Sequence, residues 1–296
     1  MFPIKAFVFS VLAINSILAG TPFENQQRIA IQGDAIVQNL LGEIYFNGND
    51  EVAQDFVKAV EWFRLSANQG YAAAQYNLGI MYFYGHGVIL DYEQAYKWYK
   101  QAADQNHTLA QYELGFIHRF GLGVKRNQSQ SAQWLQQAAN NGVLLAQYDL
   151  AVNFEKGEGV KKDYQKAIKW FGKAAEGGHP AAQYNLGLMF HNAMGIPLNY
   201  DEARRWFIMS AEGGLAEAQF QLGSIYYDAI GVRQDFIKAH MWFEIAAFYG
   251  HRDGYSWRDE TAAKRMSQQE IREAQKLAQD WIQVHAAKIS KPVVSQ

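Results

Sequence analysis

The chain contains no cysteine, and this absence excludes several kinds of chemistry. None of its 296 residues can form a disulfide bond, a thiolate metal site or a cysteine nucleophile. Proline is also scarce, with five residues in the whole chain, while hydrophobic residues make up 49% and aromatic residues 15%. A chain of this composition can bury a core and is far from the composition of a disordered protein.

The chain also lacks an excess of positive charge. Its formal net charge is -2 and its isoelectric point is near 6.5, whereas a general nucleic-acid binder needs clustered lysine and arginine to displace counterions. Two of the adjacent basic pairs, Lys161-Lys162 and Arg204-Arg205, lie beside acidic residues. We interpret them as solvated surface, and we expect no nucleic-acid partner.

The first 20 residues have the layout of a secretory signal peptide. Lys5 is followed by an apolar stretch from Ala6 to Leu18 and then by Ala19 and Gly20. This stretch is shorter than the roughly 20 residues of a spanning helix. We therefore expect residues 1–20 to be removed and the protein to be exported, to the periplasm or outside the cell, without a stable membrane anchor. Retention of the leader as an anchor is the alternative.

The chain repeats itself every 36 residues. The spacing holds for glutamines that follow alanine and, separately, for tryptophans: Gln75, Gln111, Gln147, Gln183 and Gln219; Trp62, Trp98, Trp134, Trp170, Trp206 and Trp242. The interval between the first two units is 37 residues because the first loop is longer. A fixed period of this length is typical of a solenoid of stacked supersecondary units.

Each unit is predicted to contain two helices, for example about Ala73 to Tyr84 and about Tyr92 to Asp104, because apolar and small residues recur there at helical spacing. The tryptophans are predicted to be core residues. The glycines of Gly85-His86-Gly87 are predicted to end the first helix rather than to bind phosphate. An aspartate or asparagine is predicted to cap each second helix: Asp91, Asn127, Asp163, Asn199 and Asp235.

This pattern of alanine, Leu-Gly, tyrosine, Gly-x-Gly-Val and tryptophan resembles the Sel1-like repeat, a relative of the tetratricopeptide repeat. The resemblance covers about Gly33 to Gly250 and implies an all-α, right-handed superhelical solenoid from an exported bacterial protein. Ala151, Ala193 and Ala229 depart from the pattern by replacing glycines. The predicted units lie near 33–69, 70–105, 106–141, 142–177, 178–213 and 214–250, within a repeat domain of 21–250.

After Gly250 the repeat ends, and residues 251–285 are predicted to form a helical cap that covers the last unit. Ser267 and Glu270 have the spacing of a capping box. Residues 286–296 are predicted to be a loose tail.

Four positions on each first helix vary between units and fall on one face, starting at residues 73, 77, 80 and 84. The resemblance implies that this stripe lies on the concave side and binds a peptide or protein, with asparagines holding its backbone. Simple solvated surface is the alternative. The stripe residues predicted to contact a partner are Asn77, Ile80, Tyr84, Glu113, Phe116, Phe120, Asp149, Asn185 and Gln221.

The sequence shows no catalytic, cofactor or metal motif. Some Sel1-like proteins have been described as β-lactamases, but no serine here has a lysine three positions later. The histidines lack zinc-ligand spacing, and His118 and His191 are interpreted as packed edges. We therefore expect a monomeric, non-catalytic adaptor for envelope regulation or host interaction. A β-lactamase-like hydrolase and a structural spacer are the alternatives.

Overall fold

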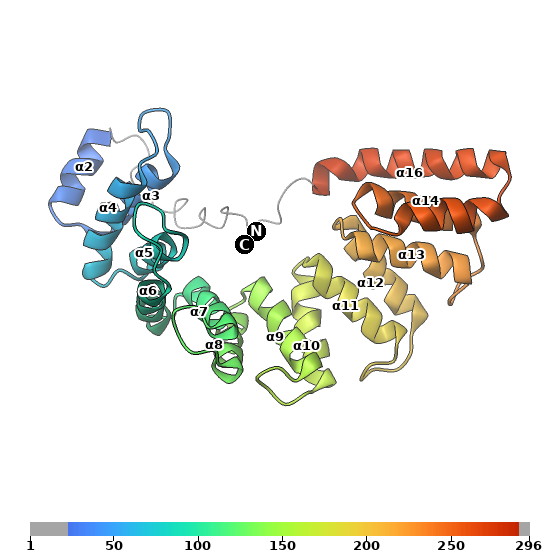
Figure 1. The fold of residues 1–296 in the computed structure, drawn as a ribbon, viewed down its shortest axis with the longest axis horizontal. Coiled ribbons are helices and arrows are strands. Elements are labelled where there is room, and N and C mark those ends of the chain that lie inside the picture. The colour runs from blue at the N-terminus through green and yellow to red at the C-terminus, as the bar shows by residue number, and fades with distance from the viewer. Residues whose placement is uncertain (1–22, 290–296) are drawn as a thin grey trace. The chain divides into compact units, whose positions relative to one another are not determined.

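The computed structural model describes residues 23–289, and every regular element in this range is a helix. The helices form two compact units, and the division between the units falls between Asn141 and Gly142 in the sequence. Within each unit, helices that open a repeat (A-helices) alternate with helices that close it (B-helices), as Figure 1 shows. The predicted all-helical solenoid is confirmed. The predicted leader lies outside the described residues.

The N-terminal unit begins with α2 (Phe23–Ile31). Its A-helices are α3 (Ala35–Asn47), α5 (Ala72–Tyr84) and α7 (Thr108–Phe120), and its B-helices are α4 (Phe56–Asn68), α6 (Tyr92–Asp104) and α8 (Gln128–Asn140). The C-terminal unit has A-helices α9 (Leu144–Lys156), α11 (Pro180–His191) and α13 (Ala216–Asp228), B-helices α10 (Tyr164–Glu176), α12 (Tyr200–Glu212) and α14 (Phe236–Phe248), and a cap of α15 (Gly254–Ser256), η2 (Trp257–Ala262), η3 (Ala263–Arg265) and α16 (Gln268–Ile289).

The predicted caps set where the B-helices begin. Asp91 accepts hydrogen bonds from the backbone N–H groups of Glu93 and Gln94, at 2.9 and 3.0 Å. The other predicted caps, Asn127, Asp163, Asn199 and Asp235, each accept one bond in the same first turn. These bonds satisfy donors that have no partner within the helix.

The loop between two helices depends on a left-handed residue and on a close backbone approach. Gly85 ends α5 at φ 71°, and a Cβ on Gly87 would lie 2.3 Å from the carbonyl oxygen of Phe56. Only glycine therefore fits at position 87, the second glycine of the loop. In the C-terminal unit, Ala193 and Ala229 replace the first loop glycine and still adopt φ values of 53° and 58°, so these two departures keep the left-handed conformation at that position.

The tryptophans are less central than their spacing predicts. Trp170 and Trp242 are buried, but the other four keep partial exposure. The fully buried large side chain is instead the next residue in each B-helix: Phe63, Tyr99, Leu135, Phe171, Phe207 and Phe243. In five of the six units this residue packs against the A-helix glycine of its own repeat, as Tyr99 does against Gly79. The tryptophans occupy the edge of the core, and this part of the prediction needs correction.

The repeated glutamine joins one repeat to the next. Gln183 donates to the carbonyl oxygen of Ala175 at 3.0 Å, and Gln219 donates to Ala211 at 3.1 Å. Each amide therefore bonds to a carbonyl in the last turn of the preceding B-helix, which also accepts a backbone bond from the following turn. Gln75 makes the equivalent bond to Ala67 at 3.3 Å. The need for an amide donor at this contact explains why glutamine recurs at this position of the repeat.

The C-terminal cap closes the solenoid as predicted. Ser267 and Glu270 exchange backbone and side-chain hydrogen bonds of 2.7 to 3.3 Å. On α16, Ala274 and Ala278 are fully buried, and Trp281 packs edge-to-face on Trp242 at 5.5 Å. The helix continues to Ile289, so residues 286–289, which were predicted to be a loose tail, are helical.

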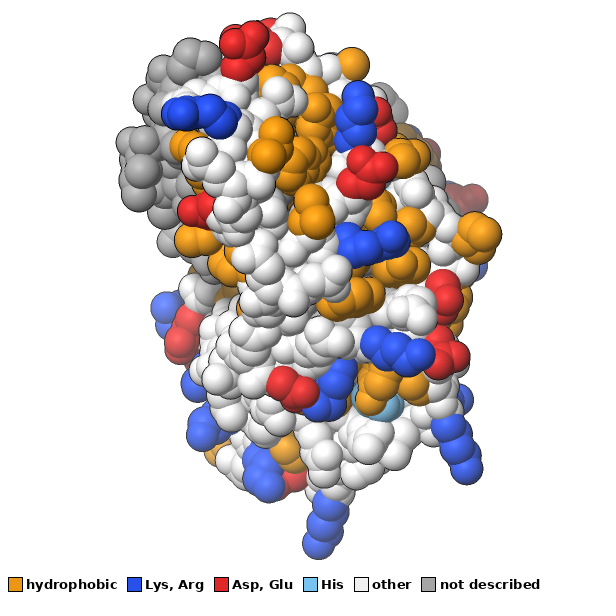
Figure 2. Space-filling view, turned by 90° about the vertical axis from the view of Figure 1, so that its left-hand side faces the viewer, with side chains coloured by type: hydrophobic (Ala, Val, Ile, Leu, Met, Phe, Trp, Pro, Cys, Tyr) orange, Lys and Arg blue, Asp and Glu red, His pale blue; other side chains and the backbone are white. Residues whose placement is uncertain are grey.

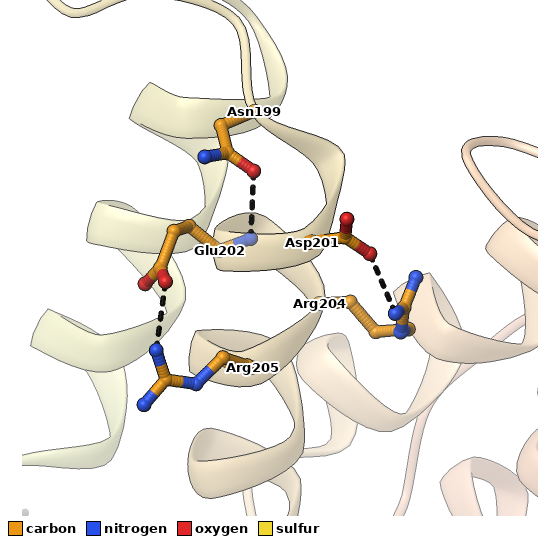
Figure 3. Close-up of polar contacts among 5 residues, drawn as sticks. All are labelled: Asn199, Asp201, Glu202, Arg204 and Arg205. Carbon is orange, nitrogen blue, oxygen red and sulfur yellow. Dashed lines mark hydrogen bonds and ion pairs between the residues drawn. The ribbon is translucent and has the colours of Figure 1, made fainter.

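The basic pair Arg204-Arg205 is neutralised within its own helix. Arg204 bonds to Asp201 and Arg205 to Glu202, both at 2.7 Å, while Asn199 caps the N–H group of Glu202 (Figure 3). Figure 2 shows acidic and basic side chains interspersed, with a band of hydrophobic side chains, on the face turned to the viewer. Neither feature provides the clustered positive charge that phosphate binding needs.

Candidate protein-binding site on the A-helices

The predicted stripe is exposed at only some of its positions. In the N-terminal unit, Tyr84 is 45% exposed and Phe120 is 55% exposed, and Phe116 is half-buried. Asn77 and Ile80 are 5% and 7% exposed. The expectation that all of these side chains are free of core packing is therefore wrong for Asn77 and Ile80.

Asn77 is buried because its amide is used inside the protein. Its Nδ2 donates to Oδ1 of Asn39 at 2.9 Å and lies 3.4 Å from Oε1 of Glu43. Asn39 in turn donates to Glu43 at 2.8 Å. These three side chains link α5 to α3, so the predicted bond from Asn77 to a partner's backbone is replaced by a bond between neighbouring A-helices.

We call Tyr84, Phe116 and Phe120 the aromatic patch. The rings of Phe116 and Phe120 lie 4.5 Å apart, and Phe83 lies edge-to-face against both Tyr84, at 5.0 Å, and Phe116, at 6.3 Å. These contacts join α5 and α7, so the patch is a fixed feature of two packed helices. Exposed aromatic surface that is held rigid in this way is typical of protein contact sites.

Glu113 lies beside the patch, one helical turn before Phe116 and Ile117. Burial raises the pKa of its carboxyl to about 7. Burial raises the pKa of the phenols of Tyr76, Tyr84 and Tyr99, and the charge of Glu113 raises it further. The residue keeps partial exposure, and among the described residues no lysine or arginine forms an ion pair with it.

In the C-terminal unit the predicted residues Asp149, Asn185 and Gln221 lie at equivalent positions of α9, α11 and α13, and each is partly exposed. The Asn185 side chain hydrogen-bonds to the phenol of Tyr148, which opposes the rise that burial causes in the pKa of that phenol. Asn185 therefore acts, like Asn77, between neighbouring A-helices. These residues form a polar surface with no aromatic patch.

Sequence reasoning missed Phe83, Asn39 and Glu43. Phe83 was overlooked because its column was not among the four variable ones, although its ring supports the patch. Glu43 falls in the column of Ile80 once the 37-residue first interval is allowed for. Aligning the first repeat with that one-residue offset would have shown a carboxylate in an otherwise largely apolar column.

The histidines have structural positions. His107 accepts a bond from the N–H group of Ala110 at 3.3 Å and stacks on Tyr76 at 4.6 Å, and burial lowers its pKa to about 4. His118 is buried against the edge of Tyr96, and His191 packs on Tyr200, so their interpretation as packed edges is confirmed. Between residues 23 and 289 no three histidine, aspartate or glutamate side chains are grouped to hold a metal ion.

The geometry defines the class of protein, which is a helical repeat protein built from stacked antiparallel helix pairs. The family model of the Sel1 repeat matches six consecutive segments: 35–71, 72–107, 108–143, 144–179, 180–215 and 216–247. The chain therefore belongs to the Sel1 repeat family. Proteins of this family are typically protein-interaction scaffolds, and their repeat is generally a non-catalytic fold.

The comparison with solved structures found similar bacterial proteins. A Sel1 repeat protein from Oxalobacter formigenes is 32% identical, with a TM-score of 0.65 over 79% of this chain and 90% of that chain. The antigen c5321 from uropathogenic Escherichia coli is 26% identical, with a TM-score of 0.46 over 89% of this chain and 79% of that chain. Among proteins of curated function, none matches this chain. No helix in residues 23–289 is long and apolar enough to cross a membrane.

Proposed function

We propose that the protein is a non-catalytic adaptor that binds a peptide or protein segment on its A-helices, the side that the family resemblance assigns to the concave face. The observation that carries the proposal is the exposure of Tyr84 and Phe120 beside Phe116 on two packed helices. Aromatic side chains are enriched at protein interfaces and among the few residues that dominate binding energy there. Asp149, Asn185 and Gln221 provide additional polar contacts in the C-terminal unit.

The test removes the exposed part of the patch without touching the core. Purified protein and the double variant Tyr84→Ala, Phe120→Ala are compared in their capture of proteins from an extract of the source cells. The matched control is the double variant Leu65→Ala, Ile89→Ala, which removes two exposed apolar side chains elsewhere in the same unit. We expect the control to capture the same partner as the unchanged protein and the patch variant to lose it.

Identical capture by all three proteins would reject the patch as the binding site. If none of the three proteins captures a specific partner, the result would favour a structural spacer. A β-lactamase-like hydrolase would instead turn over a chromogenic β-lactam, with activity abolished by a single serine or carboxylate substitution.

We further propose that the protein is exported and monomeric, and that it serves envelope regulation or contact with a host. The support is the arrangement of Lys5, the apolar stretch and the small residues that follow it. The mass of the mature protein tests this directly. Loss of about 20 residues supports cleavage, and an intact N-terminus in the membrane fraction would show that the leader is kept as an anchor.

A further inference from the structure

The aromatic patch has a carboxylate beside it and no described cation to balance it. Glu113 is on α7, one helical turn before Phe116, and its charge adds to the rise that burial causes in the pKa of the phenols of Tyr76, Tyr84 and Tyr99. Removing a carboxylate from water is costly unless a positive charge or hydrogen bonds replace the water. Its partial exposure leaves it reachable from outside. A cation that would complete this site would have to come from another molecule.

We propose that the aromatic patch binds a partner segment in which a lysine or arginine is flanked by apolar side chains, with the cation paired to Glu113. This inference rests on the proposed function and adds the chemistry of the partner to it. The apolar side chains would pack on Tyr84, Phe116 and Phe120, and the aliphatic stem of the basic residue would cross the ring of Tyr84. A cation can also rest against aromatic rings, which adds to the attraction.

The chemistry of the neighbours supports this choice of partner over an acidic one. An acidic segment would place a second negative charge beside Glu113. A purely apolar segment would leave the carboxylate buried without a cation. A basic and apolar segment satisfies both the patch and the charge, and this complementarity decides between the three.

The first experiment selects binding peptides from a random library displayed on phage, and the residues enriched in them show which side chains the patch prefers. Selection is carried out against the full chain, against Glu113→Gln, and against the double variant Tyr84→Ala, Phe120→Ala. We expect the unchanged protein to enrich peptides with lysine or arginine next to phenylalanine, tryptophan or leucine. Glu113→Gln should lose the preference for the basic residue and keep the preference for apolar ones, and the patch variant should enrich neither.

The outcomes separate this inference from the proposed function. Enrichment of apolar or acidic peptides that depends on Tyr84 and Phe120 would overturn the inference and leave the adaptor intact. Enrichment that is unaffected by either variant would overturn both. Concentration-dependent self-association that the patch variant abolishes would show that a second copy of the chain occupies the patch, and this would also overturn the inference.

The second experiment measures the affinity of the best basic peptide by calorimetry at pH 6 and pH 8. Only the ionised form of Glu113 attracts a cation, and the carboxyl is protonated below a pKa of about 7. We expect binding to be about tenfold tighter at pH 8, with release of a proton near pH 7. Glu113→Gln should bind with the same affinity at both values.

Other titratable groups near the site are accounted for in this test. The phenols of Tyr76, Tyr84 and Tyr99 have pKa values raised above their usual value of 10. His107, which stacks on Tyr76, titrates near pH 4. His86 stacks on Tyr84 at 5.8 Å, so the series is repeated with His86→Asn. Persistence of the pH dependence in His86→Asn supports Glu113 as its source, and its loss would overturn that assignment.

Discussion

Gly79 on α5 lies directly against the ring of Tyr99 on α6: a methyl group on Gly79 would come within 2.6 Å of Cδ1 of that ring. Tyr99 is 1% exposed and packed on all sides. The two helices of a repeat can approach this closely only because the A-helix carries glycine at the contact. The same relationship holds between Gly42 and Phe63, and between Gly223 and Phe243.

The substitution Gly79→Ala is therefore expected to destabilise the N-terminal unit by about 1–3 kcal/mol, because overpacking forces a buried ring to move. Gly172→Ala on α10 is the matched control, since apart from its chain neighbours and the nearby backbone of its own helix no atom lies within 4 Å of the position its Cβ would take. That change should stabilise the protein by about 0.5–1 kcal/mol through the higher helix propensity of alanine. Urea unfolding followed by circular dichroism measures both, and equal stability of Gly79→Ala and the unchanged protein would contradict the argument.

Ala229 ends α13 in the left-handed region, at φ 58°. An alanine in this conformation costs roughly 1–2 kcal/mol, a cost that glycine avoids, although glycine loses more entropy on folding. We expect Ala229→Gly to raise the stability of the C-terminal unit by about 0.5–1 kcal/mol. Ala181→Gly, in the first turn of α11, should lower stability by up to about 1 kcal/mol. A shift of the unfolding midpoint in the same direction for both variants would show that the loop conformation is not the cause.

The periodicity of the sequence was sufficient to predict the fold. The helices predicted at about Ala73 to Tyr84 and Tyr92 to Asp104 are found at Ala72–Tyr84 and Tyr92–Asp104. Caps and loop glycines are local features, and their effects depend on a few adjacent residues. For this reason they could be predicted from the residues of one repeat alone.

The candidate site could be predicted only in part. Variation of a column between repeats shows that the residue type is not fixed, but it does not show that the side chain is exposed. Asn77 varies in type with its column and is nevertheless buried, because α3 supplies Asn39 and Glu43 within hydrogen-bonding distance. Contacts between side chains of neighbouring A-helices depend on non-repeated pairs, which periodicity cannot predict.

Glu113 is expected to make the stability of the N-terminal unit depend on pH. Its carboxyl has an ordinary pKa of 4.5, and burial raises this to about 7 in the folded protein. A carboxyl whose pKa is raised on folding destabilises the folded protein at pH values above its unfolded pKa. This cost is therefore absent below pH 4.5, grows as the pH rises from 4.5 to about 7, and is complete above pH 7.

The variant Glu113→Gln removes this cost because its amide has the shape of the carboxyl and no charge. In the absence of a partner it should match the unchanged protein at pH 4 and be more stable at pH 8, by up to about 3 kcal/mol. Unfolding in urea at pH 4, 6 and 8 measures the difference. The exposed Glu158→Gln serves as the matched control. A difference that is the same at pH 4 and pH 8 would show that the Glu113 carboxyl does not titrate in this range.

Trp281 is expected to stabilise the C-terminal unit alone. It packs on Trp242 at 5.5 Å and on Tyr249 at 6.2 Å, so it covers the last B-helix, which has no following repeat. Its replacement by alanine uncovers that core, and we expect a loss of about 2–3 kcal/mol. Hydrogen exchange should then show lower protection in α14 and α16 and unchanged protection in the N-terminal unit, which is a separate compact unit. Val284→Ala, which truncates a 61% exposed side chain on the same helix, should leave protection unchanged. A loss of protection shared by both units would instead mean that they unfold as one.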